Sequence, residues 1–398
     1  MLNSFCFVQN IKVSFFESVI RTVGGLLGAY TLCKDKKLVE KAKEIADILI
    51  LAYERNNIFS APRINLKTKL TYEYDEGPFY QRVLAEIGSV QMEFCYLSYL
   101  TGDPKYAKVS LKALDYLYNL NPGLYPVRYD VSVRGVINPT GKVTIGALAD
   151  SFYEYNLKLW LFFDKKYDRF KRVYEKTFDM IQRHLVVEDE SKEFVYLKEI
   201  NPQDHVMDHL ACFMSGAFAL SAHTNGEVSI YNNDLRTAKR LADACVHAYR
   251  TTVTGLAPEI VSYKERGYSS VVTRSDWWLG YYLRPETIES LYVLYAVTQD
   301  AVYKDIAWEI FVAINATARV DNGFSSLRNV QAFPPGHDEY YLDKQESFFL
   351  AETLKYLYLI FSDDIVFPFD KFVFTTEAHI FPVLKNFEIP ESWDFKAS

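Results

Sequence analysis

The segment LRPETIES, residues 283–290, places two carboxylates at the start of a run that is otherwise apolar. Pro285 suits the first position of a helix, where no N–H donor is needed. Glu286 and Glu289 then lie three residues apart on one face of that helix. Acidic residues stabilise helix N-termini, but a helix that is apolar on all sides is buried, and buried carboxylates are costly unless paired. The segment indicates either an ion pair with Arg284 or carboxylates that do chemistry.

Acidic residues also recur near the start of five other apolar segments: Glu17, Glu86 with Glu93, Asp150 with Glu154, Asp208 beside His209, and Glu346 with Glu352. Each acid alone is explained well as a helix cap or an ion pair, as for Glu17 and Arg21 at a spacing of four. Their recurrence at the same end of six segments favours a cavity lined with carboxylates. Like-charge repulsion there raises pKa values, which acid–base catalysis needs, and the cavity attracts a hard cation such as Ca²⁺.

The acids recur because the sequence itself repeats. Segments 28–49, 95–117 and 292–314 each read as an apolar helix, a turn carrying aspartate, and an amphipathic helix. The turn aspartates are Asp35, Asp103 and Asp300, with weaker copies at Asp164, Asp234 and Asp364, at intervals of 60 to 70 residues. Apolar first helices and amphipathic second helices favour concentric rings over an open solenoid. We therefore expect an all-α fold, an (α/α) toroid, forming a single domain over residues 1–398.

Five longer irregular stretches precede the first helices, at residues 56–78, 121–143, 186–205, 253–280 and 318–344. Connections of this length usually carry function. They are expected to surround the carboxylates.

Composition narrows the class of protein. The chain has 398 residues, 16% of them aromatic, with a net charge of −7. It has no Lys/Arg block of the kind that binds nucleic acid, no apolar run approaching a membrane span of about 20 residues, and no basic region typical of a signal peptide. The cysteines form no cluster and show no C-x-x-C, which argues against zinc. Carboxylates, aromatic rings and a toroid point to carbohydrate hydrolysis by two acids.

Eight segments carry a more specific signature: FFESVIRTVGGLLGAY, AEIGSVQMEF, ALADSFYEYNLK, MDHLACF, TGLAPEIV, LRPETIESLYVLY, ESFFLAETLKYLYLIF and VFTTEAH. In this order, from about residue 14 to about residue 382, they resemble the class I α-1,2-mannosidases, glycoside hydrolase family 47. The resemblance implies a seven-hairpin α/α barrel, of which about six hairpins are present here, and a small C-terminal β-hairpin that plugs one end.

The resemblance also implies roles for individual residues. It implies an inverting exo-α-1,2-mannosidase that trims high-mannose N-glycans, with Ca²⁺ bound by the carbonyl and hydroxyl oxygens of Thr376. Glu286 matches the general base, while Glu17 and Asp150 are near-equal candidates for the general acid. Positions that bind the sugar or support those that do are Arg21, Glu86, His209, Arg284, Glu289, Phe348, Glu352 and Glu377.

Further expectations concern the cell compartment and the extent of the domain. Cys212 and Cys245 match the family's disulfide pair, which implies an oxidising compartment, so we expect the secretory pathway (endoplasmic reticulum or Golgi) or secretion. The family has an earlier hairpin before FFES, so the domain is expected to be N-terminally incomplete, with membrane association only through a segment absent here. Leu148 stands where endoplasmic-reticulum members carry arginine and resembles Golgi and secreted members, which remove several mannoses.

Two alternatives remain open at this stage. One is a catalytically weak, glycan-binding protein similar to the ER-degradation-enhancing mannosidase-like proteins. The other is an inactive truncated product. The acids at Glu17, Asp150 and Glu286 favour the active enzyme over the glycan-binding protein, whereas the expected absence of one hairpin supports the truncated product.

Overall fold

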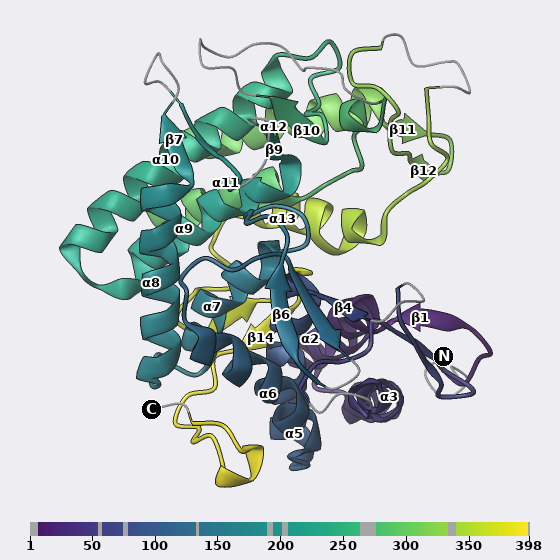
Figure 1. Ribbon diagram of the computed structural model, residues 1–398. Coiled ribbons are helices and arrows are strands. Elements are labelled where there is room, and N and C mark those ends of the chain that lie inside the picture. The colour runs from purple at the N-terminus through teal and green to yellow at the C-terminus, as the bar shows by residue number, and fades with distance from the viewer. Residues whose placement is uncertain are drawn as a thin grey trace. The chain divides into compact units, whose positions relative to one another are not determined.

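The computed structural model describes residues 7–54, 58–74, 79–132, 135–188, 194–200, 206–262, 276–332 and 340–396. The chain divides into two compact units (Figure 1). Unit 1 comprises residues 1–143, 148–177 and 367–398, and unit 2 comprises residues 144–147 and 178–366.

Unit 1 is built mainly from helices, which are α1 (Phe15–Glu17), η2 (Ser18–Val23), α2 (Gly24–Cys33), α3 (Lys36–Leu49), η3 (Ile50–Tyr53), α4 (Leu84–Gly88), α5 (Gln91–Thr101), α6 (Lys105–Leu120), α7 (Asp150–Phe162) and η7 (Glu391–Trp393). Its described strands form antiparallel sheets. One sheet contains β1 (Lys12–Ser14), β2 (Arg63–Asn65) and β3 (Thr71–Tyr72), and another contains β4 (Phe79–Val83), β5 (Arg128–Ser132) and β6 (Ile137–Thr140). Strands β13 (Phe372–Phe374) and β14 (Ile380–Pro382) form a pair. Helix α8 (Asp168–His184) runs from unit 1 into unit 2.

The helix pairs of unit 1 follow the predicted pattern. Asp35 caps α3 by accepting the Lys37 N–H, and Asp103 accepts the Lys105 N–H at the start of α6. Among the first helices, α7 is buried on all sides from Ser151 to Phe162 and α5 is buried from Gln91 to Ser98, whereas Leu32 of α2 is exposed. The second helices, α3 and α6, bury only one face. The contrast between first and second helices is thus present in the structure.

Unit 2 contains β7 (Val186–Glu188), β8 (Val195–Leu197), β9 (Val206–Asp208), η4 (His209–Cys212), α9 (Phe213–Asn225), α10 (Val228–Arg250), β10 (Ile260–Ser262), η5 (Asp276–Leu279), α11 (Glu286–Thr298), α12 (Val302–Thr317), β11 (Arg319–Val320), β12 (Gly323–Phe324), η6 (Phe349–Thr353) and α13 (Leu354–Ile360). Helix α9 packs between α10 and α11 (Figure 1). Strands β9 and β10 are antiparallel, with Asp208 opposite Ile260. These elements carry the candidate residues of unit 2.

Two of the weaker repeat copies were wrong in detail. Asp234 lies inside α10 rather than in a turn, and its buried side chain accepts hydrogen bonds from Ser221 and Gln182. The turn between α9 and α10 is made instead by Gly226, which has a φ of 85°. After Asp364 no second helix follows, because the described chain continues into β13 and β14.

The C-terminal β-hairpin expected from the resemblance is present as β13 and β14. Its Phe381 is fully buried in unit 1, and its ring centroid lies 4.7 Å from that of Tyr96 on α5. Helices α2 and α7 also contact the hairpin. Its connecting turn carries Thr376 and Glu377, so this packing fixes the position of both residues within unit 1.

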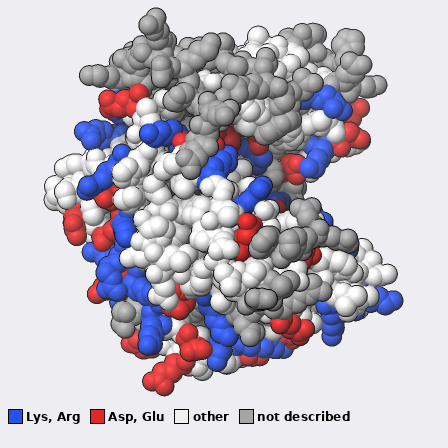
Figure 2. All heavy atoms as spheres, viewed as in Figure 1, with Lys and Arg blue, Asp and Glu red and all other residues white. Residues whose placement is uncertain are grey.

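The surface carries charges of both signs. On the face in Figure 2, Lys and Arg side chains are interspersed with Asp and Glu among the described residues. None of the described helices is long and apolar enough to cross a membrane.

Replacing Phe381 with alanine tests the anchoring of the hairpin. We expect the free energy of unfolding to fall by about 3–5 kcal/mol, because a fully buried ring is removed and a cavity is left. Urea denaturation of the variant and of Leu32→Ala, whose side chain is 59% exposed, provides the measurement and its control. Equal denaturation midpoints in the two variants would contradict the packing described.

Candidate active site

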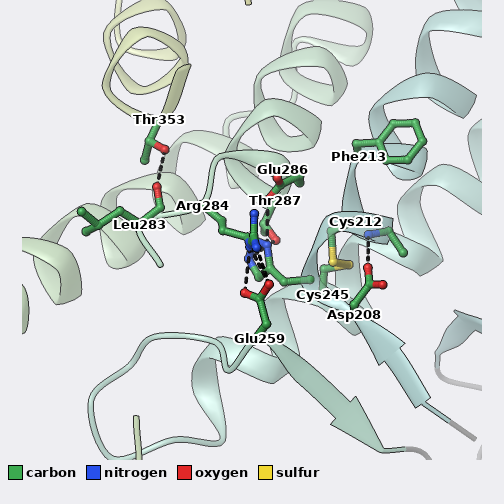
Figure 3. A network of polar contacts seen from close by, with 12 residues as sticks. Asp208, Cys212, Phe213, Cys245, Glu259, Leu283, Arg284, Glu286, Thr287 and Thr353 are labelled. Carbon is green, nitrogen blue, oxygen red and sulfur yellow. Dashed lines mark hydrogen bonds and ion pairs between the residues drawn. A yellow bond between two sulfur atoms is a disulfide. The ribbon is translucent and has the colours of Figure 1, made fainter. Parts of the chain in front are cut away.

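Glu286 begins helix α11 in unit 2 and is buried, with 8% of its surface exposed. Pro285 lies immediately before the helix, one residue earlier than its expected place as the first helical residue. Leu283 adopts a φ of 60°, and its carbonyl accepts a 2.7 Å hydrogen bond from the Thr353 hydroxyl (Figure 3). This contact holds the turn that delivers Arg284 and Glu286.

His209 is the direct partner of Glu286. The Nδ1 atom of His209 lies 2.8 Å from Oε2 of Glu286, and its Nε2 atom lies 2.7 Å from the Tyr249 hydroxyl. Burial acts to raise the pKa of Glu286, but the His209 hydrogen bond and the positive charge of Arg284 outweigh it and hold that pKa below its ordinary value. Glu286 is therefore ionised at neutral pH, as a general base must be.

Arg284 does not form the ion pair with Glu286 that its neighbouring position suggested. Its guanidinium makes a two-pronged contact with the buried carboxylate of Glu259 (Figure 3). The rings of Phe348 and Tyr282 lie 5.7 Å and 5.9 Å from the same guanidinium, within the range of a cation–π contact. The structure thus brings Arg284 and Phe348, both named as site residues, together and adds Glu259 to them.

Glu259 was missed as a site residue, although it lies in the segment TGLAPEIV. Strand pairing explains its position: the His209 peptide N–H donates to the Glu259 carbonyl at 2.8 Å, next to the β9–β10 pair. Residues 50 positions apart in sequence are therefore neighbours. In the sequence, only its place in the family segment TGLAPEIV could have indicated Glu259 as a site residue.

Asp208 turns out to be a structural acid. Its carboxylate accepts the peptide N–H groups of Ala211 and Ala147, capping η4 and holding residues 144–147. A Cβ atom on Gly146 would lie 2.0 Å from this carboxylate, so glycine is required there. Among the acids predicted to line a cavity, Asp208 therefore fits the alternative interpretation, that of a helix cap.

Glu289 lies on α11 together with Glu286, and Glu352 lies on η6, which contacts α11. Glu289 accepts a 3.2 Å hydrogen bond from Tyr356 of α13. Glu352 is buried in η6, which is a short π-helix. Such π-helical turns frequently mark functional sites.

In unit 1, Glu17 and Arg21 form the predicted pair at a spacing of four. Arg21 Nε lies 2.5 Å from Glu17 Oε2 and 3.4 Å from Oε1 of Glu377. Arg21 belongs to η2, a second π-helical segment. The Glu17 side chain is 47% exposed, so its carboxylate is accessible to a ligand while Arg21 orients it.

Glu86 lies in the first turn of α4 and Asp150 begins α7, and these two helices pack together in unit 1. The Ala85 N–H donates to the Leu148 carbonyl at 3.0 Å, which aligns the two helix starts. Burial, together with the negative charge of Glu17, raises the pKa of Glu86 to about 7 against the lowering effect of the hydrogen bond from Tyr74. A carboxyl that titrates near neutrality is suited to proton transfer.

Thr376 lies beside a second buried carboxyl in unit 1. The Tyr155 hydroxyl is 2.7 Å from Oε1 of Glu93 and 3.3 Å from the Thr376 peptide nitrogen. Burial raises the pKa of Glu93 to about 8, with Glu154 and Glu377 adding to the effect. Its other oxygen has no hydrogen-bond partner among the described residues.

Cys212 and Cys245 form the predicted disulfide (Figure 3). It links η4, which carries His209, to α10, which carries Tyr249. The cross-link therefore joins the element that carries His209, the partner of Glu286, to the element that carries Tyr249.

Comparison with known proteins identifies the family. The model of glycosyl hydrolase family 47 matches residues 2–383. The chain belongs to glycosyl hydrolase family 47.

Named relatives agree with this assignment. The chain is 37% identical over 389 residues to mannosyl-oligosaccharide 1,2-alpha-mannosidase IB of Mus musculus, covering 95% of this chain and 58% of the relative. It is 34% identical to the endoplasmic reticulum mannosyl-oligosaccharide 1,2-alpha-mannosidase of Schizosaccharomyces pombe, covering 94% of this chain and 75% of the relative. The chain thus spans little more than half the length of the mouse relative.

A solved structure confirms the fold. The α-1,2-mannosidase from Trichoderma reesei superposes with a TM-score of 0.84 at 29% identity, covering 96% of this chain and 85% of that chain. The predicted α/α class of family 47 is therefore confirmed. A D-mannose isomerase, with a TM-score of 0.58 and 14% identity, shares the fold alone.

Removal of the disulfide tests its contribution to unit 2. The two cysteines are 33 residues apart, so the double variant Cys212→Ser/Cys245→Ser should lose about 3–4 kcal/mol of stability, on the loop-closure model. Chemical denaturation with and without a reductant gives the measurement, and the exposed Cys33→Ser serves as the control. An unchanged midpoint in the double variant would contradict a structural role for the bond.

Proposed function

We propose that this protein is an α-1,2-mannosidase that removes α-1,2-linked mannose from high-mannose N-glycans. Family membership gives the class of reaction, and the buried His209–Glu286 pair is the observation that carries the proposal. It supplies an ionised carboxylate inside an apolar fold, which is the state that a general base requires. The relatives named above act, by their names, on mannosyl-oligosaccharides.

We propose that Glu286 activates the water and that Glu17 or Asp150 acts as the acid, so that the anomeric centre is inverted. Arg21, Glu86, His209, Arg284, Glu289, Phe348, Glu352 and Glu377 would bind the sugar or hold the groups that do. Because the family match covers residues 2–383, we also propose that residues 1–398 work as one catalytic domain.

Ca²⁺ is the proposed cofactor, held by the two oxygens of Thr376. The described residues contain no group of three or more His, Cys, Asp or Glu side chains able to hold a metal, so further ligands would be water or substrate hydroxyls. The surroundings nonetheless fit such a cation: the nearby donors are oxygens, and one oxygen of the buried Glu93 lacks a hydrogen-bond partner among the described residues. The ion would supply a fixed positive charge that orients sugar hydroxyls.

The secretory pathway is the proposed location, because disulfides persist in oxidising compartments. A relative named for the endoplasmic reticulum supports this proposal. Leu148, 39% exposed with a φ of 77°, presents no hydrogen-bond donor to a glycan branch. We propose that this permits removal of several mannoses.

Release of free mannose from a Man₉ glycan tests the activity. We expect Glu286→Gln to reduce the rate by about 10²–10⁴-fold, since loss of a general base costs that much. Glu309→Gln, which alters an exposed ion pair with Arg250, should leave the rate unchanged. A folded wild-type protein that binds the glycan without releasing mannose would instead indicate the glycan-binding alternative. No release from a protein without a stable fold would indicate the inactive truncated product.

The same assay separates the two acid candidates. Glu17→Gln and Asp150→Asn each remove one ionisable group, and the general acid is the one whose loss costs about 10²-fold or more. The other residue, acting in binding, should raise KM more than it lowers kcat. Equal and small effects in both variants would refute both assignments.

Calcium binding is tested through stability rather than turnover. Since a ligand that binds only the folded state raises Tm, added Ca²⁺ should raise the Tm of the wild type and EGTA should abolish the rise. The Thr376→Ala variant should need at least about 10-fold more Ca²⁺ for the same rise in Tm, because one ligand oxygen is lost. Thr251→Ala, at the exposed end of α10, is the control. Identical calcium titrations for the two variants would reject Thr376 as a ligand.

A further inference from the structure

We propose that Tyr249 is a positioning residue for the reaction, because its hydroxyl fixes the imidazole of His209 with Nδ1–H directed at Glu286. This inference rests on the proposed function, in which Glu286 is the base. It assigns a role to Tyr249 of α10, which reaches Glu286 through His209.

The contacts form one continuous chain inside unit 2. Tyr249 is 2% exposed and His209 is 4% exposed. The Tyr249 hydroxyl lies 2.7 Å from Nε2 of His209, and Nδ1 of the same ring lies 2.8 Å from Glu286. Thr287 also faces Nε2, but at the longer distance of 3.3 Å. Tyr249 is therefore the closer of the two hydroxyls.

The chemistry of imidazole links the two ends of this chain. A neutral imidazole carries one N–H, and the other nitrogen is an acceptor. When the Tyr249 hydroxyl donates to Nε2, the proton must be on Nδ1, where it meets the ionised carboxylate of Glu286. With the proton on Nε2 instead, the Nδ1 lone pair would face that carboxylate and repel it. Control of the tautomer through the second nitrogen is a general device in histidine sites.

The backbone around this chain is restrained at both ends. His209 lies three residues before Cys212, and Tyr249 lies four residues, about one helical turn, after Cys245. The disulfide joins those two cysteines, and the Ser290 hydroxyl of α11 donates to the Cys212 carbonyl at 2.6 Å. The elements that carry Tyr249, His209 and Glu286 are thus tied to one another directly.

Other groups also lie around Glu286 and His209. Arg284 lowers its pKa through charge, but Arg284 is bound by Glu259. Tyr281 packs on Tyr249, with ring centroids 6.3 Å apart. Glu289 follows Glu286 by three residues on the same helix and is bound by Tyr356. Unlike these three groups, His209 contacts both the Glu286 carboxylate and the Tyr249 hydroxyl.

Tyr249→Phe is the test, read as the pH dependence of kcat/KM for mannose release from Man₉. Activity falls at low pH as Glu286 becomes protonated. Loss of the tyrosine hydroxyl frees the imidazole to place its proton on Nε2, and burial then raises the pKa of Glu286. We expect the acidic limb to move up by about one pH unit, since a hydrogen bond to a charged group contributes about that much. A merely structural role would lower activity equally at all pH values.

Two controls make the result specific. Tyr292→Phe removes the hydroxyl of another fully buried tyrosine, two turns along α11 from Glu286, and should leave the limb in place. Thr287→Val removes the more distant hydroxyl and should shift the limb by less than Tyr249→Phe. An unmoved limb in a folded, active Tyr249→Phe, or an equal shift in Tyr292→Phe, would overturn the proposal.

A second measurement does not depend on turnover. Nitrogen-15 NMR of histidine-labelled wild type, with the His209 signals assigned from His209→Gln, reports which ring nitrogen carries the proton. Protonated Nδ1 with an accepting Nε2 supports the proposal even if Tyr249→Phe fails to fold, and protonated Nε2 alone overturns it. Failure of the proposed function would appear separately, as a wild type that has this tautomer but releases no mannose.

Discussion

The cost of burying a carboxylate is the constraint on which the candidate site depends. First helices that are apolar on all sides form the interior of each unit, yet several begin with Glu or Asp, and an unpaired buried charge is expensive. Several of the buried acids described above have a donor supplied by another segment. Glu286 has His209, Glu259 has Arg284, and Glu93 has Tyr155. These pairings restrict side-chain positions that apolar packing alone would leave free.

Donor identity then determines what each acid can do. A histidine hydrogen bond and a nearby arginine hold the pKa of Glu286 low, so that it is a base at neutral pH. Burial and the negative charge of Glu17 outweigh the hydrogen bond from Tyr74 and raise the pKa of Glu86 to about 7. Carboxylates whose environments push their pKa values apart are typical of sites that use one as an acid and another as a base. The same residue type thus serves different roles because its neighbours differ.

The sequence was sufficient for elements that depend on local patterns. Apolar and amphipathic periodicity predicted the helix pairs, and the acids at helix starts were located because the first turn of a helix has its own residue preferences. Partners set by pairing between distant segments were not accessible in this way. An ion pair between Arg284 and Glu286, two residues apart, was one of two interpretations, but the β9–β10 pair presents Glu259 to Arg284. Asp208 and Asp234 likewise proved to be held by groups from other segments, Ala147 and Gln182.

Backbone geometry is the other feature that periodicity could not predict. Arg21 lies in η2 and Glu352 in η6, and both segments are π-helical turns placed within otherwise regular first helices. A π-turn adds one residue to the hydrogen-bonded ring and so rotates the side chains that follow it relative to an α-helix. An α-helical spacing rule assigns residues to faces correctly only before such a turn. Because both turns occur where a predicted site residue lies, the departures from regular helix are part of how the fold positions its charged groups.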